Sequence, residues 1–371
     1  MTRIAVIGGG VVGAAIAYEL SRLPHLQVTL LEENQAASGS TGAALGILMG
    51  VISQKTKGRT WRLRDASLRR YQTLIPELEA LTGQSIPYNR QGLLKLCFQA
   101  EDWPKWKQLQ AQRQAAGWRL ELWDREMLQQ RCPHLAEADL VGAVYSPQDG
   151  QVDPLVLTQA LIAGARQNGA ECRLGVTVEG GLVNGEKSRF CRQLDTSHGT
   201  LAVDGVIISA GLGTLPLTEH WQAPVSMQPV LGQAVRLRLP QSFGDAGFQP
   251  VIAGDGVNLV PLGNQEYGLG ATVEFPNASG EVVADEAEFE QLWERAIAFC
   301  PALTQAEIIT RWSGKRPRPQ GRPAPIIEPL TGYDNIWLAS GHYRNGVLLA
   351  PATALRIRDF LDAVDFANLK P

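Results

Sequence analysis

The chain opens with an apolar block, a glycine-rich turn and a second apolar block. Ile4 to Ile7 is apolar without alternation, which is typical of a strand buried on both faces of a parallel sheet. Ala14 to Leu20 contains few helix-breaking residues, and Gln27 to Leu31 predicts a second buried strand. The order of strand, turn, helix and strand predicts a parallel sheet covered by helices.

The segment from Trp61 to Leu81 predicts a long helix. Apolar residues recur there at steps of three and four, and Gly83 supplies a stop signal. The apolar positions are Leu68, Tyr71, Ile75 and Leu78. The helix also carries a basic cluster, which we expect to be a solvated face because no aromatic residues or wider basic patch accompany it. Its members are Arg62, Arg64, Arg69 and Arg70.

The middle of the chain predicts further strands and helices. Strand-like runs cover 93–98 and 141–145, a polar helix is expected around 102–116, and a strand is expected over 170–178. Asp153 and Pro154 are typical of an N-cap and first turn, and predict a helix to about Gln167. Val206 to Gly211 predicts a buried strand that ends in small residues, where a ligand can approach the backbone.

The pattern changes between residues 225 and 275. Alternating runs at 230–239, 257–261 and 267–273 are broken by Gly and Pro, which predicts antiparallel sheet. Asp285, followed three residues later by Glu288, is typical of a capping box and predicts a helix that Pro301 closes. We therefore expect the chain to begin in one layer, to contribute two separate segments to a second layer, and to return to the first layer at its end.

The glycine-rich turn carries the first chemical signal. Gly8 allows a tight turn, Gly10 lets the main chain approach a pyrophosphate, and Gly13 lets helix and strand pack closely. Glu32 ends the second strand, where a carboxylate can accept hydrogen bonds from a ribose diol. The sequence therefore predicts a Rossmann-type dinucleotide site, with N–H groups at the helix N-terminus facing the phosphates.

This motif does not separate FAD from NAD. Ser38 to Ala44 places small and hydroxyl residues directly after the second strand. Such residues let the main chain approach a flat ring or a second phosphate, as FAD requires. Taken alone, the segment is equally typical of a flexible Ser/Gly loop.

Composition and charge argue against several classes of binding partner and site. The 34 basic and 37 acidic residues give a net charge of −3, which argues against nucleic acid or anionic lipid as a partner. Five separated cysteines without a Cys-x-x-Cys pair favour buried thiols in a reducing cytosol over disulfides or a zinc site, and no metal site is predicted. The apolar start is interrupted by glycines and lacks a cleavage site, and the apolar run 42–52 is too short to cross a bilayer. We therefore expect a cytoplasmic protein without firm membrane association.

The C-terminal region carries a family resemblance. Residues 340–353, SGHYRNGVLLAPAT, closely resemble the flavin signature of glycine oxidases, within the D-amino-acid oxidase superfamily of FAD enzymes. Residues 312–317, WSGKRP, are similar to that family's Trp-x-Gly-x-Arg-Pro segment. Further similar segments are LVP at 259–261, GAT at 270–272, PVLGQ at 229–233, GLLKL at 92–96 and DGQVDP at 149–154. The resemblance spans nearly the whole chain.

The resemblance implies an α/β fold of two domains. A Rossmann-type FAD-binding domain with a parallel sheet would comprise residues 1–50, 143–216 and 322–371. A substrate domain with a mostly antiparallel sheet and helices would comprise 51–142 and 217–321, and would cover the flavin ring.

It also implies non-covalent FAD and oxidation of an amine, by hydride transfer from the α-carbon to flavin N5 and hydrolysis of the resulting imine. By position, Arg316 would pair with the substrate carboxylate, since a guanidinium fork matches a carboxylate. Arg344 would help the helix N-terminus stabilise the reduced ring, and His342 and Tyr343 would contact flavin through their backbone. The residues expected at the reacting centre are Arg316, Arg344, Asn258, His342 and Tyr343. The residues expected to bind FAD are Gly8, Gly10, Val11, Val12, Gly13, Glu32, Glu33, Ser40, Thr41, Gly42, Ala43, Ala44, Gly46, Val178, Ala210, Gly211, Arg316, Gly341, His342, Tyr343, Arg344, Asn345, Gly346 and Val347.

The chain departs from the family pattern at Asn258, where such enzymes often have a Tyr that helps hold the substrate carboxylate. Asn can donate a hydrogen bond but reaches less far. The expected substrate is glycine, sarcosine or a small D-amino acid. Three alternatives stay open: an NAD-dependent dehydrogenase, a D-amino-acid dehydrogenase with a non-oxygen acceptor, and a flavin-binding interaction partner with altered or lost activity. A homo-oligomer is compatible with the sequence.

Overall fold

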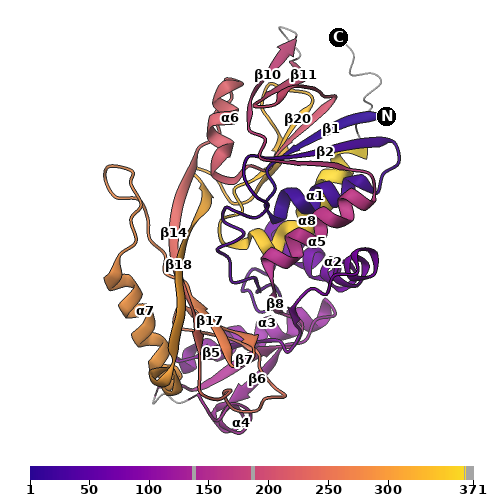
Figure 1. Cartoon of the computed structure of the whole chain (residues 1–371). Helices are drawn as coiled ribbons and strands as arrows, with labels where there is room; N and C mark the ends of the chain where they lie inside the picture. The colour runs from indigo at the N-terminus through magenta and orange to yellow at the C-terminus, as the bar shows by residue number, and fades with distance from the viewer. Residues whose placement is uncertain (136–138, 185–188, 363, 365–371) are drawn as a thin grey trace.

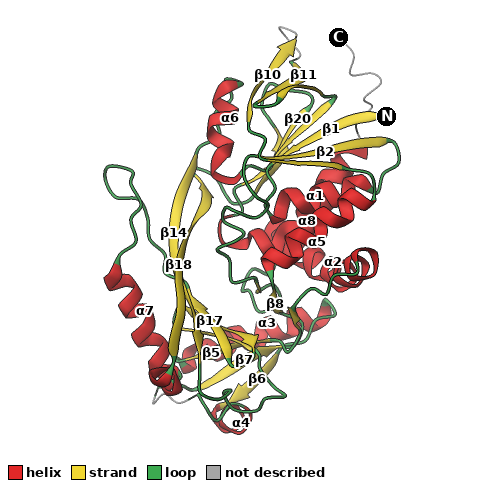
Figure 2. Cartoon of the chain, in the orientation of Figure 1, coloured by secondary structure: helices red, strands yellow, loops and turns green. Residues whose placement is uncertain are grey.

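A mostly parallel six-stranded sheet forms the first layer of the protein (Figures 1 and 2). The computed structural model describes residues 1–135, 139–184, 189–362 and 364. The strands of this sheet, in spatial order, are β19 (Ile326–Pro329), β20 (Ile336–Ser340), β13 (Gly205–Ile208), β1 (Thr2–Ile7), β2 (Leu26–Glu32) and β9 (Glu171–Leu174). All neighbours pair in parallel except β19, which runs antiparallel to β20.

Both faces of the first sheet are covered, which explains the apolar run at Ile4 to Ile7. Ile4 and Val6 pack into a core with the helices, whereas Ala5 and Ile7 pack on the other side. Figure 1 shows the helices stacked on one face. They are α1 (Val11–Ser21), α2 (Gly58–Thr82), α5 (Pro154–Gln167) and α8 (Gly346–Asp362). The other face carries a small sheet of β10 (Val178–Asn184), β11 (Phe190–Thr196) and β12 (Gly199–Ala202), near α6 (Thr214–His220).

An eight-stranded sheet forms the second layer, and its neighbours pair antiparallel except β15 with β5. In spatial order its strands are β18 (Glu307–Pro319), β14 (Met227–Arg238), β17 (Glu266–Gly270), β16 (Val257–Gly263), β15 (Val251–Gly254), β5 (Leu93–Cys97), β7 (Gly142–Ser146) and β6 (Glu121–Asp124). Its helices are α3 (Trp103–Ala115), α4 (Arg125–Arg131) and α7 (Glu286–Phe299). Figure 1 shows β14 and β18 as a long ribbon beside α7. A third sheet joins β3 (Ile47–Leu48), β8 (Gly150–Val152) and β4 (Tyr88–Asn89).

The fold class is confirmed, and the local predictions need three corrections. The strand expected over 170–178 is broken by a turn at Gly175, whose φ is +74°. Glu288 does not complete a capping box, because the Asp285 N–H donates to Glu274 Oε2 at 2.7 Å while the Asp285 carboxylate caps Ala287 N–H. The boundary expected between 142 and 143 falls inside β7. The division into two domains stays a prediction.

The cap signal at Asp153 is confirmed, because its carboxylate accepts hydrogen bonds from the N–H groups of Leu155 and Val156. Gly83 ends α2 in the left-handed conformation, as predicted.

All five cysteines are free, and burial raises their thiol pKa values. Among the helices of the described residues, none is long and apolar enough to cross a membrane.

Candidate cofactor and substrate site

The glycine turn between β1 and α1 is shaped for a ligand that lies against the backbone. Gly8 has φ of +109°, and a Cβ there would lie 2.5 Å from Ser209 O. A Cβ on Gly13 would lie 1.9 Å from Gly8 O, so only glycine permits this approach of helix and strand. Gly10 is the N-cap of α1 and has no side chain to satisfy the first N–H groups of the helix. The N–H groups of Val12 and Gly13 lie in this first turn, and unpaired N–H groups at a helix N-terminus favour the binding of an anion.

The end of β2 supplies the acceptor that the sequence predicts. Glu32 Oε2 accepts from Gly9 N–H at 2.6 Å and Oε1 accepts from Asn34 N–H at 3.0 Å, which fixes the carboxylate beside the glycine turn. Val176 N–H donates to Glu32 O at 2.9 Å, so the chain leading to Val178 passes the same point. Glu33, in contrast, is exposed.

Ser209 Oγ, next to the Gly8 turn, is buried and has no hydrogen-bond partner among the described residues. The close glycine backbone, the open helix N-terminus and the fixed carboxylate together fit an adenine dinucleotide. These features are the ones that the first fifty residues predict.

The loop from Ser40 to Gly46 connects this turn to the second sheet. Thr41 Oγ1 accepts from Val11 N–H at 3.1 Å, at the start of α1. Ser40 Oγ donates to Lys315 O at 2.7 Å, and Trp312 Nε1 donates to Ala43 O at 3.1 Å. The loop is therefore held against β18.

Several positions along this contact must be small. A Cβ on Gly46, whose φ is +76°, would lie 1.8 Å from Val152 O. A Cβ on Gly314 of β18 would lie 2.2 Å from the Cβ of Ala43, and one on Gly268 of β17 would lie 2.8 Å from Leu45 Cδ2. Gly42 and Ala44 lie in the same loop, which is partly exposed.

Arg316 lies on the sheet face that this loop covers. In register across the sheet, Asn258 pairs with Gly270, Gly270 with Ala234, and Ala234 with Trp312. Cross-strand partners project to one face, and residues two or four apart on a strand share that face. Trp312, Arg316 and Asn258 therefore face the same side of the sheet.

The Arg316 guanidinium is fixed by glycine and by two carbonyl groups. A Cβ on Gly232 would lie 2.1 Å from Arg316 Nη2, so the guanidinium occupies the space above this glycine. Arg316 Nη1 donates to Leu231 O at 2.9 Å and to Thr272 O at 3.1 Å. Burial lowers the pKa of Arg316, and the nearby charge of Arg344 lowers it further. Within the described chain the Arg316 guanidinium forms no ion pair, so it can bind an anion.

The C-terminal signature lies at the carboxyl ends of the parallel strands. Gly341 follows β20 with φ of +67°, and a Cβ there would lie 2.6 Å from Pro319 Cγ of β18. Ala210 and Gly211 follow β13 at the same sheet edge, and Gly211 also approaches β18 through Pro317. Tyr343 has φ of +55° and begins a short 3₁₀ turn that leads into α8.

Helix α2 anchors the start of α8. Tyr71 Oη donates to Val347 O at 2.6 Å. Gly346 begins α8, and Arg344 and Tyr343, which directly precede this helix, lie near enough to Arg316 to change its pKa. Arg344 is exposed beside it.

His342 faces the interior. The residue is 4% exposed, and its Nε2 lies 2.8 Å from Thr353 Oγ1 of α8. Burial lowers the pKa of His342 to about 3, so the imidazole is neutral at pH 7. The side chain therefore stabilises the signature loop, and the contact of His342 with flavin through its backbone stays a prediction.

We expect His342 to make stability depend on pH. The unfolded ring takes up a proton near pH 6.5, whereas the buried ring resists protonation down to about pH 3. Stability from the neutral ring is thus complete above about pH 6.5 and falls on acidification, by at most about 1.4 kcal/mol per pH unit. Urea unfolding of wild type and His342→Gln between pH 7.5 and 5 measures it. Parallel pH dependences in the two proteins would contradict the expectation.

Two members of the basic cluster are not solvated, which corrects the prediction for α2. Arg64 Nη1 donates to Met49 O at 2.5 Å and Nη2 donates to Asn345 Oδ1 at 3.1 Å. Arg70 is 9% exposed and pairs with Glu19 and Glu77. Arg62 and Arg69 are exposed as predicted.

Arg64 thus connects the loop after β3 to the C-terminal signature. The signal was available in the sequence, because Arg64 lies four residues before Leu68 and shares its buried helix stripe.

A buried ionic group supports the loop after β3, and the sequence reasoning missed it. Asp149 accepts from the N–H groups of Gly50, Val51 and Ile52 at 2.7 to 2.8 Å. Arg113 donates to the carbonyl groups of Val51, Ser53 and Lys55 at 2.6 to 2.9 Å. Because Asp149 lies about 100 residues from the loop, only the tertiary structure reveals this support.

Asn258 is held by the sheet itself. Its Nδ2 donates to Gly270 O at 3.2 Å on the neighbouring strand β17. One amide N–H is therefore used within the protein, and the other N–H and Oδ1 remain for a ligand.

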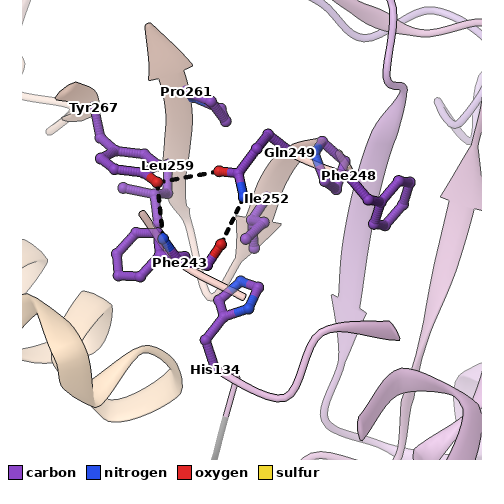
Figure 3. A pocket seen from close by; sticks show the side chains of 9 residues that line it. His134, Phe243, Phe248, Gln249, Ile252, Leu259, Pro261 and Tyr267 are labelled. Atoms are coloured by element: carbon purple, nitrogen blue, oxygen red, sulfur yellow. Dashed lines mark hydrogen bonds between the residues drawn. The ribbon is translucent and has the colours of Figure 1, made fainter. Parts of the chain in front are cut away.

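A small cavity lies against the second sheet and is lined by residues that include His134, Leu259 and Tyr267 (Figure 3). Tyr267 Oη accepts from Phe243 N–H and donates to Gln249 Oε1, both at 3.1 Å. The cavity volume of about 10 Å³ has room for about one water molecule. Burial lowers the pKa of His134, which lines it, to about 4. The cavity is too small for an amino acid.

The comparison with known families agrees with this geometry. The model of the family described as FAD dependent oxidoreductase, DAO, matches residues 3–359. The chain belongs to this family. It is an FAD-dependent oxidoreductase, and the glycine turn, Glu32 and the C-terminal signature lie within the matched residues.

Members of the DAO family resemble the chain over nearly its whole length. Glycine oxidase from Geobacillus kaustophilus is 30% identical over 98% of this chain and 94% of its own. The crystal structure of glycine oxidase from that organism has a TM-score of 0.85 at 28% identity, and covers 100% of this chain and 98% of its own. The bifunctional protein ThiO/ThiG from Synechocystis is 33% identical over 96% of this chain and 51% of its own, so the chain spans about half the length of that relative.

Proposed function

We propose that the chain oxidises a small amino acid or secondary amine, of the class of glycine, sarcosine or a small D-amino acid. The observation that carries the proposal is the Arg316 guanidinium, which is held on the covered sheet face with no ion-pair partner in the described chain. A carboxylate matches this fork in two hydrogen bonds. The relatives named glycine oxidase support the same substrate class.

Each group has a separate task. Arg316 binds the carboxylate and so fixes the α-carbon, which lowers the entropy cost of reaching the reactive geometry. Asn258, on the same sheet face, supplies an amide group toward the substrate. Bound FAD supplies the acceptor for the hydride that leaves the α-carbon.

The proton balance needs no base from the protein. A substrate amine that arrives neutral loses a hydride to give a protonated imine, and water then converts this imine to an oxo acid and an amine. His342 is buried and neutral at pH 7, which is compatible with a reaction that uses no protein base.

The residues that would hold FAD follow from the geometry above. The glycine turn and the N-terminus of α1 would bind the pyrophosphate and Glu32 the ribose. The loop 40–46, the ends of β13 and β20 and the signature turn would border the flavin ring. We propose that attachment is non-covalent.

The test is anaerobic mixing of purified holoenzyme with glycine, sarcosine, D-alanine and glycinamide, while flavin absorbance is recorded. We expect bleaching by the carboxylates and much weaker bleaching by glycinamide, which cannot form the charged pair with Arg316. Flavin that stays oxidised with every compound would contradict the proposal and would favour a flavin-binding protein without amine oxidase activity.

A further inference from the structure

The buried carboxylate of Glu274 is joined to Arg316 through the two carbonyl groups that hold the guanidinium. Leu231 O accepts from Arg316 Nη1 at 2.9 Å and from the Glu274 N–H at 3.0 Å. The Leu231 N–H donates to Glu274 O at 2.9 Å. The second carbonyl group belongs to Thr272, whose hydroxyl donates to Glu274 Oε1. Both acceptors of Arg316 therefore belong to residues that are hydrogen-bonded to Glu274.

The Glu274 side chain accepts three hydrogen bonds inside the protein. The donors are the Thr272 hydroxyl, Gln233 Nε2 at 3.0 Å and the Asp285 N–H at 2.7 Å, all of them uncharged groups. Glu274 is 7% exposed, and Gln233 and Thr272 are also buried. The charge of Glu274 reaches Arg316 as well, because burial lowers the pKa of the guanidinium and Glu274 raises it.

The orientation of the Gln233 amide is fixed from its other side. Arg311 Nη2 donates to Gln233 Oε1, so Nε2 is the group that faces Glu274. Gln233 Nε2 also donates to Asp285 O at 2.7 Å, and the Gln233 N–H donates to Thr272 Oγ1 at 2.8 Å. The donors around Glu274 are thus held in place by further hydrogen bonds.

A carboxylate matches this arrangement and an amide does not. Glu accepts at both side-chain oxygen atoms, whereas Gln would turn an NH2 group toward at least one of the three donors. Two buried donors that face each other both lose a partner, which costs free energy. A change at Glu274 should therefore shift Thr272 and, with it, a carbonyl group that holds Arg316.

We infer that Glu274 is a positioning residue for the substrate carboxylate and acts through Thr272 and Arg316. This inference rests on the proposed function. The carbonyl groups of Leu231 and Thr272 use the N–H groups of Arg316 Nη1, so those of Nη2 and Nε stay for the substrate. Two parallel hydrogen bonds to a carboxylate require a guanidinium in one orientation, which this buried support provides.

The first test is Glu274→Gln in the FAD-loaded enzyme, with glycine and sarcosine as substrates and acetate as an unreactive carboxylate. We expect kcat/KM to fall about tenfold, mainly through KM, and the acetate Kd, measured by flavin absorbance, to rise by a similar factor. Loss of the negative charge alone would strengthen the attraction of Arg316 for acetate, so unchanged or tighter acetate binding would overturn the inference. Glu281→Gln, which removes an exposed carboxylate from the loop after Glu274, should keep the wild-type values.

Removal of Arg316 separates positioning from a general effect on the fold. In the Arg316→Ala background, Glu274→Gln should lower kcat/KM by less than about twofold, because the group through which Glu274 acts is gone. A loss of about tenfold that persists in this background would show that Glu274 does not act through Arg316.

Thr272 offers a smaller change in the same network. Thr272→Val removes the hydroxyl between Glu274 and the Gln233 N–H but keeps the carbonyl group. We expect Thr272→Val to bind acetate more weakly, and Thr272→Ser, which keeps the hydroxyl, to recover most of the loss. Equal acetate Kd values in Thr272→Val and wild type would contradict the link from Glu274 to Arg316.

The outcomes separate the positioning role from the proposed function. If sarcosine bleaches the wild-type flavin anaerobically and Glu274→Gln has wild-type kinetics, the positioning role is wrong and the proposed function stands. If neither glycine nor sarcosine bleaches the wild-type flavin, both proposals are wrong.

Discussion

Arg316→Ala should lower kcat/KM for glycine or sarcosine by about 10²- to 10³-fold while FAD stays bound. The substrate carboxylate would lose its counter-ion in a place where burial already lowers the pKa of the arginine. The α-carbon would also lose its fixed position. Steady-state kinetics and the flavin content per protein measure the two effects separately.

Two further variants test the geometry around Arg316. Arg316→Lys should recover little of the activity, because an ammonium cannot bind a carboxylate through two parallel hydrogen bonds. Gly232→Ala should raise KM although the charge is kept, because the new methyl group would lie in the space of the guanidinium. Wild-type kcat/KM in Arg316→Ala would remove Arg316 from the site.

Gly13→Ala should produce a protein that holds little or no FAD. The new Cβ would lie 1.9 Å from Gly8 O, and both atoms belong to the turn that would bind the pyrophosphate, so helix and strand must separate. The yellow colour should be lost at purification. The ratio of flavin to protein absorbance measures the effect, and far-ultraviolet circular dichroism checks that the chain is folded.

The other glycines provide a graded control for Gly13→Ala. A Cβ on Gly10 would lie 3.1 Å from Thr41 Oγ1, so Gly10→Ala should weaken FAD binding less. Gly39 lies in the adjoining loop with no atom within 4 Å of its would-be Cβ, and Gly39→Ala should retain FAD. Equal flavin content in all three variants would show that the turn does not contact the cofactor.

Sequence patterns predicted strands, helix caps and helix ends correctly where interactions between neighbouring residues determine them. The apolar run at Ile4 to Ile7 became β1 because each of its faces has a core to enter. The Asp153 cap and the Gly83 stop depend only on nearby backbone groups, and both occur as predicted. The capping box at Asp285 is incomplete because Glu274, a distant residue, takes the N–H that Glu288 would have accepted.

The site was predicted less completely. The glycine turn and Glu32 have fixed spacing within one structural unit, so the sequence reveals them. The roles of Gly232 and Gly314 follow from what faces them, namely Arg316 and Ala43, and spacing does not show this. Arg64 was interpreted as solvated because its partners, Met49 and Asn345, come from segments far apart in the chain.

The sequence by itself determined the fold class, the Rossmann-type unit with its acid, and the family resemblance, because these depend on short-range patterns and ordered motifs. The tertiary structure decided which face of the second sheet meets the loop 40–46, and it turned the His342 ring inward and placed two arginines, Arg318 and Arg344, against the Tyr343 ring. These features depend on strand register and on packing between distant segments. A register shift of one residue would have moved Arg316 to the opposite face with no change in the sequence.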